Sequence, residues 1–213
     1  MIHGLLDRLA ERFGEGAHKL EAMRAREEYF DRAGKVFDDD AELFEGRVAS
    51  FLEWYLLERP MTLGDGPPIM RALDESLQLV PGWPAEERAA LAALATSHRS
   101  LFTLTRVDMV ERVLELEDLV GGASFLVLER RSTIGIAPGD VFEARLVWDG
   151  SAVMFGRTFL FHPPDAREAV LDWVEKAVKG GAGRDDILFH LSRQYVRWHR
   201  LGHVGAAKVY RDV

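Results

Sequence analysis

The sequence predicts an α+β protein with a helical N-terminal half, a small five-stranded antiparallel β-barrel or bent sheet, and two C-terminal helices. Three observations support this prediction. Apolar residues first recur every three to four positions, the spacing of amphipathic helices. From Leu101 they alternate with polar residues in short runs separated by turn residues, as strands do. The helical spacing then returns from Asp165. We therefore expect a helical domain at 1–98, a β-domain at 99–164 and C-terminal helices at 165–213, which pack back on the helical half.

The helical half opens with residues 1–37, whose helical spacing is interrupted at Gly14 and Gly16. In the next helix Asp39 and Glu42 have the spacing of a capping box. In that motif the two side chains accept hydrogen bonds from backbone N–H groups that have no partner in the helix. The helix is therefore expected to begin immediately after Asp39.

Proline and glycine set the remaining helix limits in this half. Pro60 ends the second long helix, because the residue before a proline disfavours the helical conformation. A short helix from Ile69 to Leu79 is expected between two loops rich in proline and glycine. An alanine-rich helix is expected to begin at Pro84, since proline suits the first turn of a helix.

The β-domain is predicted from period-two runs and from turn signals at Gly121-Gly122, Pro138-Gly139 and Asp149-Gly150. A short meander of strands has exposed edges unless it curls or is covered, which favours a barrel or a strongly bent sheet. Residues between Val127 and Trp148, Trp148 included, are expected to supply its core. The predicted strands are Leu101–Asp108, Arg112–Asp118, Ser124–Arg130, Asp140–Trp148 and Ala152–Phe161.

Two helices follow, at Asp165–Val178 and Asp185–Leu201, and the last twelve residues show no clear period. The second of these helices has an apolar seam beside arginines at three- and four-residue spacing. It either packs across the helical half, with its arginines paired to acidic residues there, or forms a partner-binding surface of residue types common in hot spots. The residues of that predicted partner-binding surface are Arg193, Tyr195, Arg197 and Trp198.

Composition limits the class of protein. The chain has 213 residues, of which 47% are hydrophobic and 29% charged, typical of a globular protein. It has no cysteine, which excludes disulfides, thiolate zinc sites and cysteine nucleophiles. It shows neither a secretory signal nor an apolar run of the roughly 18 residues that a membrane span needs. We therefore expect a cytoplasmic protein.

The net charge is −8 and is unevenly distributed. Residues 1–60 carry 9 basic and 14 acidic groups, whereas residues 184–213 carry 6 basic and 3 acidic groups. Nucleic-acid binding requires clustered cations, so the acidic chain does not favour it as a partner.

No local motif predicts catalysis. The acidic run from Asp38 to Glu45 lacks the ligand spacing of a calcium loop, and a helix cap explains it better. His199 and His203 have a four-residue spacing, but no nearby carboxylate or thiolate completes a zinc site. Phosphate-binding glycine loops and nucleophile elbows are absent from the sequence. We expect no enzyme activity, no cofactor and no metal.

Two stretches carry a first resemblance: "FLEWYLLERPMTLGDGPP" and the β-segment that ends in "FLFHPP". Together they resemble a group of uncharacterised bacterial proteins in which a helical half precedes a small β-domain. Some members carry a cysteine-bearing zinc motif of the SEC-C type, which this chain lacks. The resemblance covers about residues 40–165 and implies no activity. The matching residues are Phe51, Trp54, Asp118, Leu119, Arg131, Ser132, Gly139 and Asp140.

The β-domain also resembles, more weakly, the PilZ domains that bind cyclic di-GMP. Ser132 and Gly135 match the Asp-x-Ser-x-x-Gly motif of that family, but Arg130 stands at its aspartate position. Arg106 and Arg112 are too far apart to match its arginine pair. The resemblance implies a ligand site made by Arg130, Arg131, Ser132 and Gly135.

The leading hypothesis is a non-enzymatic interaction or regulatory protein that binds a protein partner or a second copy of itself. The alternative is a PilZ-like module that senses a cyclic dinucleotide. A third hypothesis, an enzyme, requires at least two histidines to converge in one cleft. The candidates are His162, His190, His199 and His203.

Overall fold

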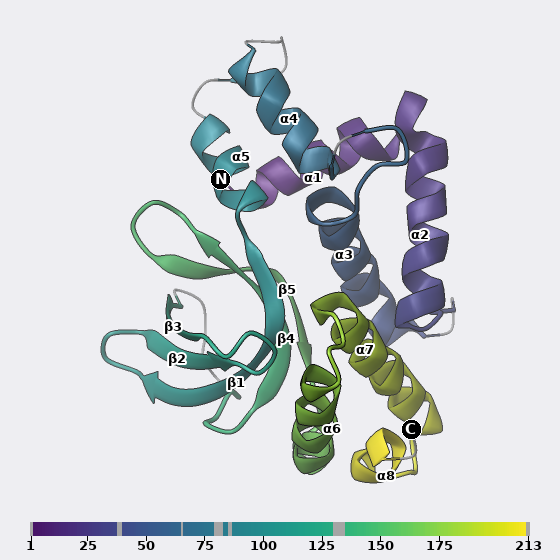
Figure 1. The fold of residues 1–213 in the computed structure, drawn as a ribbon, viewed down its shortest axis with the longest axis vertical. Coiled ribbons are helices and arrows are strands. Elements are labelled where there is room, and N and C mark those ends of the chain that lie inside the picture. Colours follow the sequence, from purple (N-terminus) through teal and green to yellow (C-terminus); the bar gives the residue numbers. More distant parts are fainter. Residues whose placement is uncertain are drawn as a thin grey trace.

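The computed structural model describes residues 2–37, 40–64, 66–78, 83–84, 87–129 and 135–211, and it places one β-sheet beside two groups of helices (Figure 1). The N-terminal helices are α1 (Ile2–Gly14), α2 (Lys19–Ala33), α3 (Ala41–Leu57), α4 (Pro68–Leu77) and α5 (Arg88–Ala95). The strands are β1 (His98–Asp108), β2 (Val113–Asp118), β3 (Ser124–Leu128), β4 (Val141–Trp148) and β5 (Val153–Phe161). The C-terminal helices are α6 (Arg167–Lys179), α7 (Arg184–Leu201) and α8 (Ala206–Arg211).

The α+β class and the position of every predicted strand are confirmed, but the sheet is mixed rather than antiparallel. Its pairing order β1-β2-β3-β5-β4 returns to β1. β3 and β5 run parallel and meet at Val127 and Val153, whereas the other neighbours are antiparallel. Strand direction reverses at every antiparallel pair. A closed ring with an odd number of strands must therefore contain a parallel pair.

The helix predictions hold with small shifts of their limits. Asp39 lies outside the described residues, and the residue that caps α3 is Asp40, whose side chain makes no cap hydrogen bond. Its carboxylate instead accepts a hydrogen bond from the backbone N–H of Phe37 at 2.8 Å. α5 begins at Arg88 rather than at Pro84. α8 is a helix of six residues that the sequence pattern did not predict.

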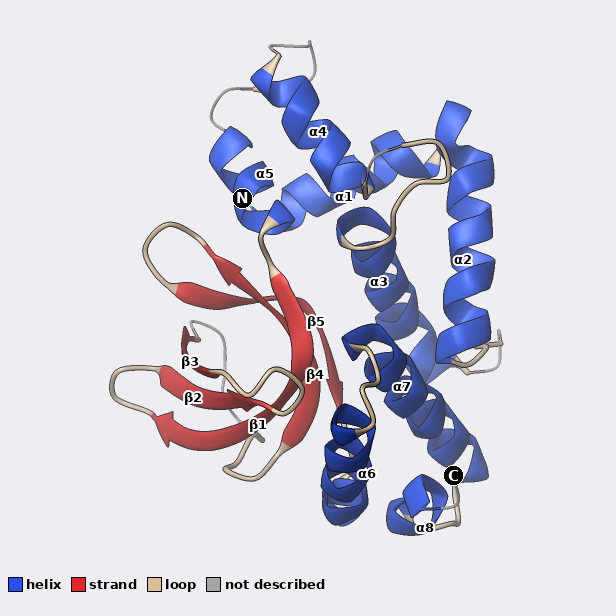
Figure 2. Ribbon diagram, viewed as in Figure 1, coloured by secondary structure: helices blue, strands red, loops and turns tan. Residues whose placement is uncertain are grey.

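Three apolar clusters hold the fold together. One lies among the N-terminal helices, one joins α6, α7 and α8 to the outer face of the sheet, and one fills the inside of the sheet. β4 contributes residues to all three clusters. Phe142 and Leu146 belong to the cluster inside the sheet. Val141 belongs to the C-terminal cluster and Val147 to the N-terminal one. Figure 2 shows helices along one side of the sheet, while the opposite side carries its hairpin loops.

α7 is the element that links the two groups of helices. It lies against α2 and also contacts β1 (Figure 1). Phe189 of α7 belongs to the N-terminal cluster, while Leu188 and Leu191 belong to the C-terminal one. None of the helices in the described ranges has the length and apolar character required to cross a membrane.

Candidate functional site

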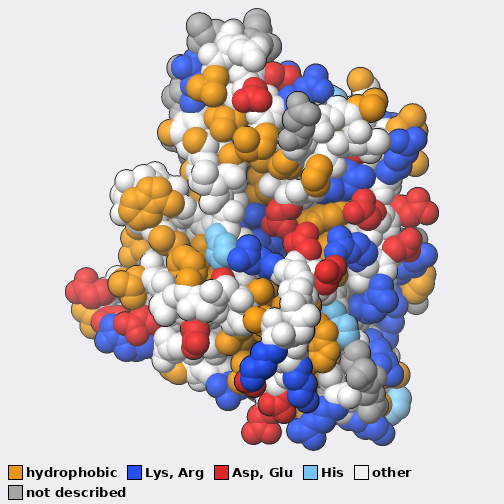
Figure 3. Space-filling view, viewed as in Figure 1, with side chains coloured by type: hydrophobic (Ala, Val, Ile, Leu, Met, Phe, Trp, Pro, Cys, Tyr) orange, Lys and Arg blue, Asp and Glu red, His pale blue; other side chains and the backbone are white. Residues whose placement is uncertain are grey.

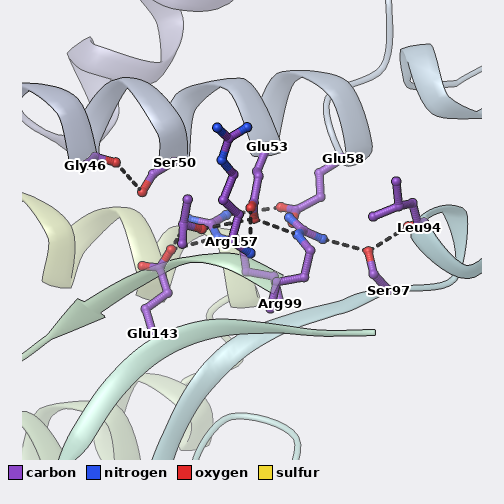
Figure 4. Close-up of polar contacts among 11 residues, drawn as sticks. Gly46, Ser50, Glu53, Glu58, Leu94, Ser97, Arg99, Glu143 and Arg157 are labelled. Atoms are coloured by element: carbon purple, nitrogen blue, oxygen red, sulfur yellow. Dashed lines mark hydrogen bonds and ion pairs between the residues drawn. The ribbon is translucent and has the colours of Figure 1, made fainter. Parts of the chain in front are cut away.

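Among the described residues, an extensive group of buried charges lies between α3 and the sheet. Figure 4 shows Glu53 and Glu58 projecting from the α3 side toward residues of the strands. Arg145 of β4 donates from Nε to Glu53 at 3.2 Å, from Nη1 to Ser97 at 3.1 Å and from Nη2 to Glu58. Glu53 also accepts hydrogen bonds from the Thr158 hydroxyl at 2.9 Å and from the backbone N–H of Arg157 at 3.1 Å.

A second arginine extends this group. Arg99 of β1 donates to Glu143 at 2.7 Å and to Glu58 at 3.1 Å. Burial alone would raise the pKa of Glu58, but Arg99 and Arg145 outweigh burial and hold that pKa below its ordinary value. Ion pairs from Arg99 and Arg145 to Glu53, Glu58 and Glu143 therefore join the sheet to the end of α3.

Asp118 forms a second polar centre, at the turn after β2. Its Oδ1 accepts hydrogen bonds from the Ser100 hydroxyl at 2.6 Å and from the backbone N–H groups of Val120 and Gly121, each at 2.9 Å. Its Oδ2 lies 2.8 Å from His98 Nε2. Ser100 and His98 thus bond different oxygens of Asp118. In a catalytic triad the histidine lies between the serine and the aspartate, which is not the order here.

Gly121 is required by this arrangement. A Cβ atom at this position would lie 2.6 Å from Asp118 Oδ2. Asp118 is held by hydrogen bonds from several groups and cannot easily move away. Gly121 and Gly122 predict only a turn, whereas the spacing Asp-x-x-Gly from Asp118 is the signal of the polar centre in the sequence.

The predicted partner-binding residues of α7 are divided between internal and external roles. Arg193 donates to the backbone carbonyls of Arg32, at 3.1 Å, and of Asp31. Tyr195 and Trp198 are half-buried with ring centroids 5.8 Å apart, and Trp198 packs against the C-terminal apolar cluster. Arg197 is exposed. Arg193 thus serves to attach α7 to the segment that ends α2.

The site residues of the cyclic-dinucleotide hypothesis follow β3 in the sequence. Arg130, Arg131 and Ser132 lie outside the described residues, and Gly135 is exposed with a φ of 89°. Arg106 forms an ion pair with Glu115 at 3.0 Å.

Two of the four candidate histidines, His162 and His199, neighbour the same ring, that of Tyr195, at centroid distances of 6.4 Å and 6.3 Å. His162 is buried with Nδ1 2.8 Å from the Tyr210 hydroxyl, and burial lowers its pKa to about 3. His190 stacks on Trp173 at a centroid distance of 3.9 Å. His199 and His203 lie at and beyond the end of α7. Within the described part of the chain, no three histidine, aspartate or glutamate side chains form a group that could hold a metal ion.

Large apolar side chains are exposed on one side of the closed sheet, at two hairpin loops and on β3 between them, and we call this side the loop-end surface. Met109 and Val110 in the β1–β2 loop are 67% and 88% exposed, Leu126 on β3 is 63% exposed, and Trp148 at the end of β4 is 55% exposed. The prediction that Trp148 belongs to the core is therefore wrong. It occupies an inward position in the alternation of β4, but the strand ends there, beyond the layer that fills the sheet.

The strand register places these residues on one side of the closed sheet, on β3 and on both sides of it. Val153 is paired with Trp148 on one side and with Val127 on the other, and Leu128 is paired with Val113, where β2 leaves the β1–β2 loop. Both hairpin loops therefore flank β3, and Figure 1 shows them projecting on the same side of the molecule. Hydrophobic side chains gather on this side in Figure 3, with charged side chains beside the lower loop.

Aspartates hold both loops in shape. Asp108 Oδ1 accepts hydrogen bonds from the backbone N–H groups of Val110 at 3.1 Å and Glu111 at 3.0 Å. The bond from Glu111 is the main reason that the pKa of Asp108 is lowered. Asp149 Oδ1 accepts hydrogen bonds from the N–H groups of Ser151 at 2.8 Å and Ala152 at 2.9 Å. The exposed apolar side chains are thus presented by ordered turns.

Arg112, at the end of the β1–β2 loop, has a φ of 55°, a left-handed conformation that is unfavourable for a residue with a Cβ atom. Glycine adopts this conformation without strain but loses more backbone entropy on folding. Replacing Arg112 by glycine should therefore raise the free energy of unfolding by about 0.5–1 kcal/mol, measured by urea denaturation. Glu111→Gly in the same loop is the control and should not stabilise the protein. If Arg112→Gly were less stable than the wild type, the contacts of the Arg112 side chain would stabilise the protein by more than its left-handed backbone destabilises it.

Comparison with known proteins gives a family and no activity. No curated protein and no solved structure matches the chain. One family model does match, over residues 26–200, which include α3 to α6, all five strands and most of α2 and α7. This match confirms the expected membership of an uncharacterised family. The chain belongs to the family of unknown function DUF7986.

Proposed function

We propose that this protein is a protein-binding module and that the loop-end surface is its binding site. The observation that carries the proposal is the exposure of Met109, Val110, Leu126 and Trp148 on one side of the closed sheet. Grouped exposed apolar side chains are a feature of interaction sites, since they cost free energy in water. Tryptophan and methionine are among the residue types enriched at interfaces, and tryptophan is frequent among hot-spot residues.

The charges around this surface favour a basic partner. Among the described residues, its two loops, the end of β1 and the outer face of β2 carry two arginines and five carboxylates. The arginines are Arg106 and Arg112, and the carboxylates are those of Asp108, Glu111, Glu115, Glu117 and Asp149. Such a rim repels phosphate and attracts lysine and arginine. The partner is therefore a protein segment with apolar side chains flanked by basic residues.

The position of the surface on the sheet also supports the proposal. OB-fold barrels are likewise five-stranded, and their ligands contact the face of the second and third strands and the loops after the first and fourth strands. The loop-end surface occupies the corresponding positions. The similarity to OB-fold barrels supports only the position of the binding site. The chemistry of the partner is inferred from the exposed apolar and charged residues named above.

The test is selection of peptides from a random displayed library on the immobilised protein, followed by affinity measurement for a selected peptide. We expect selected peptides to combine lysine or arginine with aromatic or aliphatic residues. Trp148→Ala should weaken binding at least about 30-fold, as expected for a hot-spot residue.

Leu126→Ala and Leu77→Ala form a matched pair, because these leucines are 63% and 62% exposed. Leu77 is on α4, away from the loop-end surface. Only Leu126→Ala should weaken binding. Peptides without basic residues, or equal effects of the two leucine variants, would contradict the proposal. Binding of cyclic di-GMP without peptide binding would support the sensing hypothesis instead.

A further inference from the structure

The outer face of α2 carries a second apolar stripe besides the one that packs in the core. Ala25, Tyr29 and Ala33 form the buried stripe. On the outer face Leu20 is 69% exposed and Met23 is 57% exposed. Helix packing usually needs one apolar stripe. Packing against the core therefore does not explain the second stripe.

This stripe continues into a groove of about 370 Å³ that runs beside α2 and the segment after it. Phe37, which follows α2, is 55% exposed and extends the apolar lining. Arg26 lies with its guanidinium carbon 5.6 Å from the centre of the Phe30 ring. Met23, Arg26, Glu27 and Phe30 all line the groove, as expected for residues at helical positions i, i+3, i+4 and i+7.

The charges on the other side of α2 are used within the molecule. Arg59 binds Glu28 at 2.7 Å and Glu21 at 2.5 Å, and Arg32 binds Asp186 of α7 at 2.8 Å. Figures 1 and 2 both show α2 at the outer edge of the molecule, with α3 and α7 on its inner side. The groove face is therefore available to another molecule.

We infer that this face of α2 binds the same face of a second copy of the chain, with the two α2 helices antiparallel. A two-fold axis midway between residues 26 and 27 places Arg26 opposite Glu27 of the second copy, and Glu27 opposite its Arg26. It also places Met23 opposite Phe30 of the second copy. The face is thus complementary to itself in charge and in apolar contact, as a two-fold interface requires. A parallel arrangement would oppose like charges.

The expected dimer is weak. One pair of short helices buries less surface than the interfaces of stable complexes, and such small interfaces give transient association. The measurement is sedimentation equilibrium of the full chain from about 1 µM to about 500 µM, a range that includes the Kd of small interfaces. The wild type should change from monomer to dimer across this range.

Charge reversal tests the pairing. Arg26→Glu and Glu27→Arg each oppose like charges and should each raise the Kd at least about fivefold, as a charge contact of about 1 kcal/mol predicts. The double variant restores both pairs and should return the Kd to within about twofold of the wild-type value, if the interface is antiparallel. Arg24→Glu is the control, because Arg24 is exposed on the same helix but does not line the groove.

Met23→Glu should keep the protein monomeric, and thermal unfolding of each variant checks that it folds. A wild type that stays monomeric at the highest concentration would overturn the inference. So would a double variant that dimerises no better than the single variants. Because the loop-end surface is not part of this interface, peptide binding by monomeric Met23→Glu should equal that of the wild type, which separates the two proposals.

Discussion

Replacing Arg145 by alanine is expected to lower the free energy of unfolding by about 3–5 kcal/mol, the loss typical of removing one partner from a buried ion pair. Arg145 is 2% exposed and binds both Glu53 and Glu58, which are themselves buried or partly buried. Without the guanidinium, Glu53 and Glu58 would remain between α3 and the sheet and would each lose an ion-pair partner. Urea unfolding followed by far-UV circular dichroism measures the loss.

Arg157→Ala is the control for this prediction. The Arg157 side chain is 45% exposed and pairs with the exposed Asp7, so its removal should cost at most about 1 kcal/mol. The double variant Arg145→Met with Glu53→Gln removes both charges of one pair and should be more stable than Arg145→Ala. If Arg145→Ala cost no more than Arg157→Ala, the buried group would not be what holds the sheet against α3.

Replacing Asp118 by alanine is expected to cost about 3 kcal/mol at pH 7, since hydrogen bonds to a buried charged group contribute about 1.5–3 kcal/mol each and the loss is only partly additive. The change removes the acceptor for the Ser100 hydroxyl and for the N–H groups of Val120 and Gly121. Ser100 is fully buried and would have no replacement from water.

The pH dependence of this variant gives a second measurement. Burial alone would raise the pKa of Asp118, but hydrogen bonds from Ser100, Gly121 and His98 outweigh burial and lower it below the ordinary value of 3.8. A carboxyl group with a lowered folded pKa stabilises the protein above its unfolded pKa, and this stabilisation is lost as the pH falls through the folded value. The stability difference between wild type and Asp118→Ala should thus stay constant above about pH 5 and shrink below pH 3.8.

Denaturant unfolding from pH 7 to pH 3 tests this dependence, with Asp74→Ala on the exposed side of α4 as the control. If the difference in unfolding free energy stayed unchanged at the lowest pH, the pKa of Asp118 would not be lowered in the folded protein.

The strands could be predicted because alternation of apolar and polar residues is a local signal, and β1 to β5 each lie within a few residues of the predicted ranges. The parallel pair was missed because it depends on closure of the ring, where Val127 meets Val153. α8 was missed because a helix of six residues contains fewer than two turns and has no measurable period.

The buried charges could not be predicted from the sequence for a different reason. Glu143 and Arg145 alternate with Phe142, Ala144 and Leu146 along β4, a pattern that also fits a strand with one face in water. The pattern separates the two faces of the strand but does not reveal that α3 covers the polar one. Exposure of the loop-end residues was likewise unpredictable, because whether Trp148 lies inside the sheet or beyond its end depends on where the sheet closes.

We propose that the partner binds at the loop-end surface rather than at α7. The most direct measurement is hydrogen–deuterium exchange of the protein with and without a peptide selected for binding. We predict slower exchange in residues 108–112, 124–128 and 148–153, which contain the exposed apolar side chains and the turns that present them. Slower exchange confined to residues 193–198 would contradict the claim and would place the partner on the C-terminal helix.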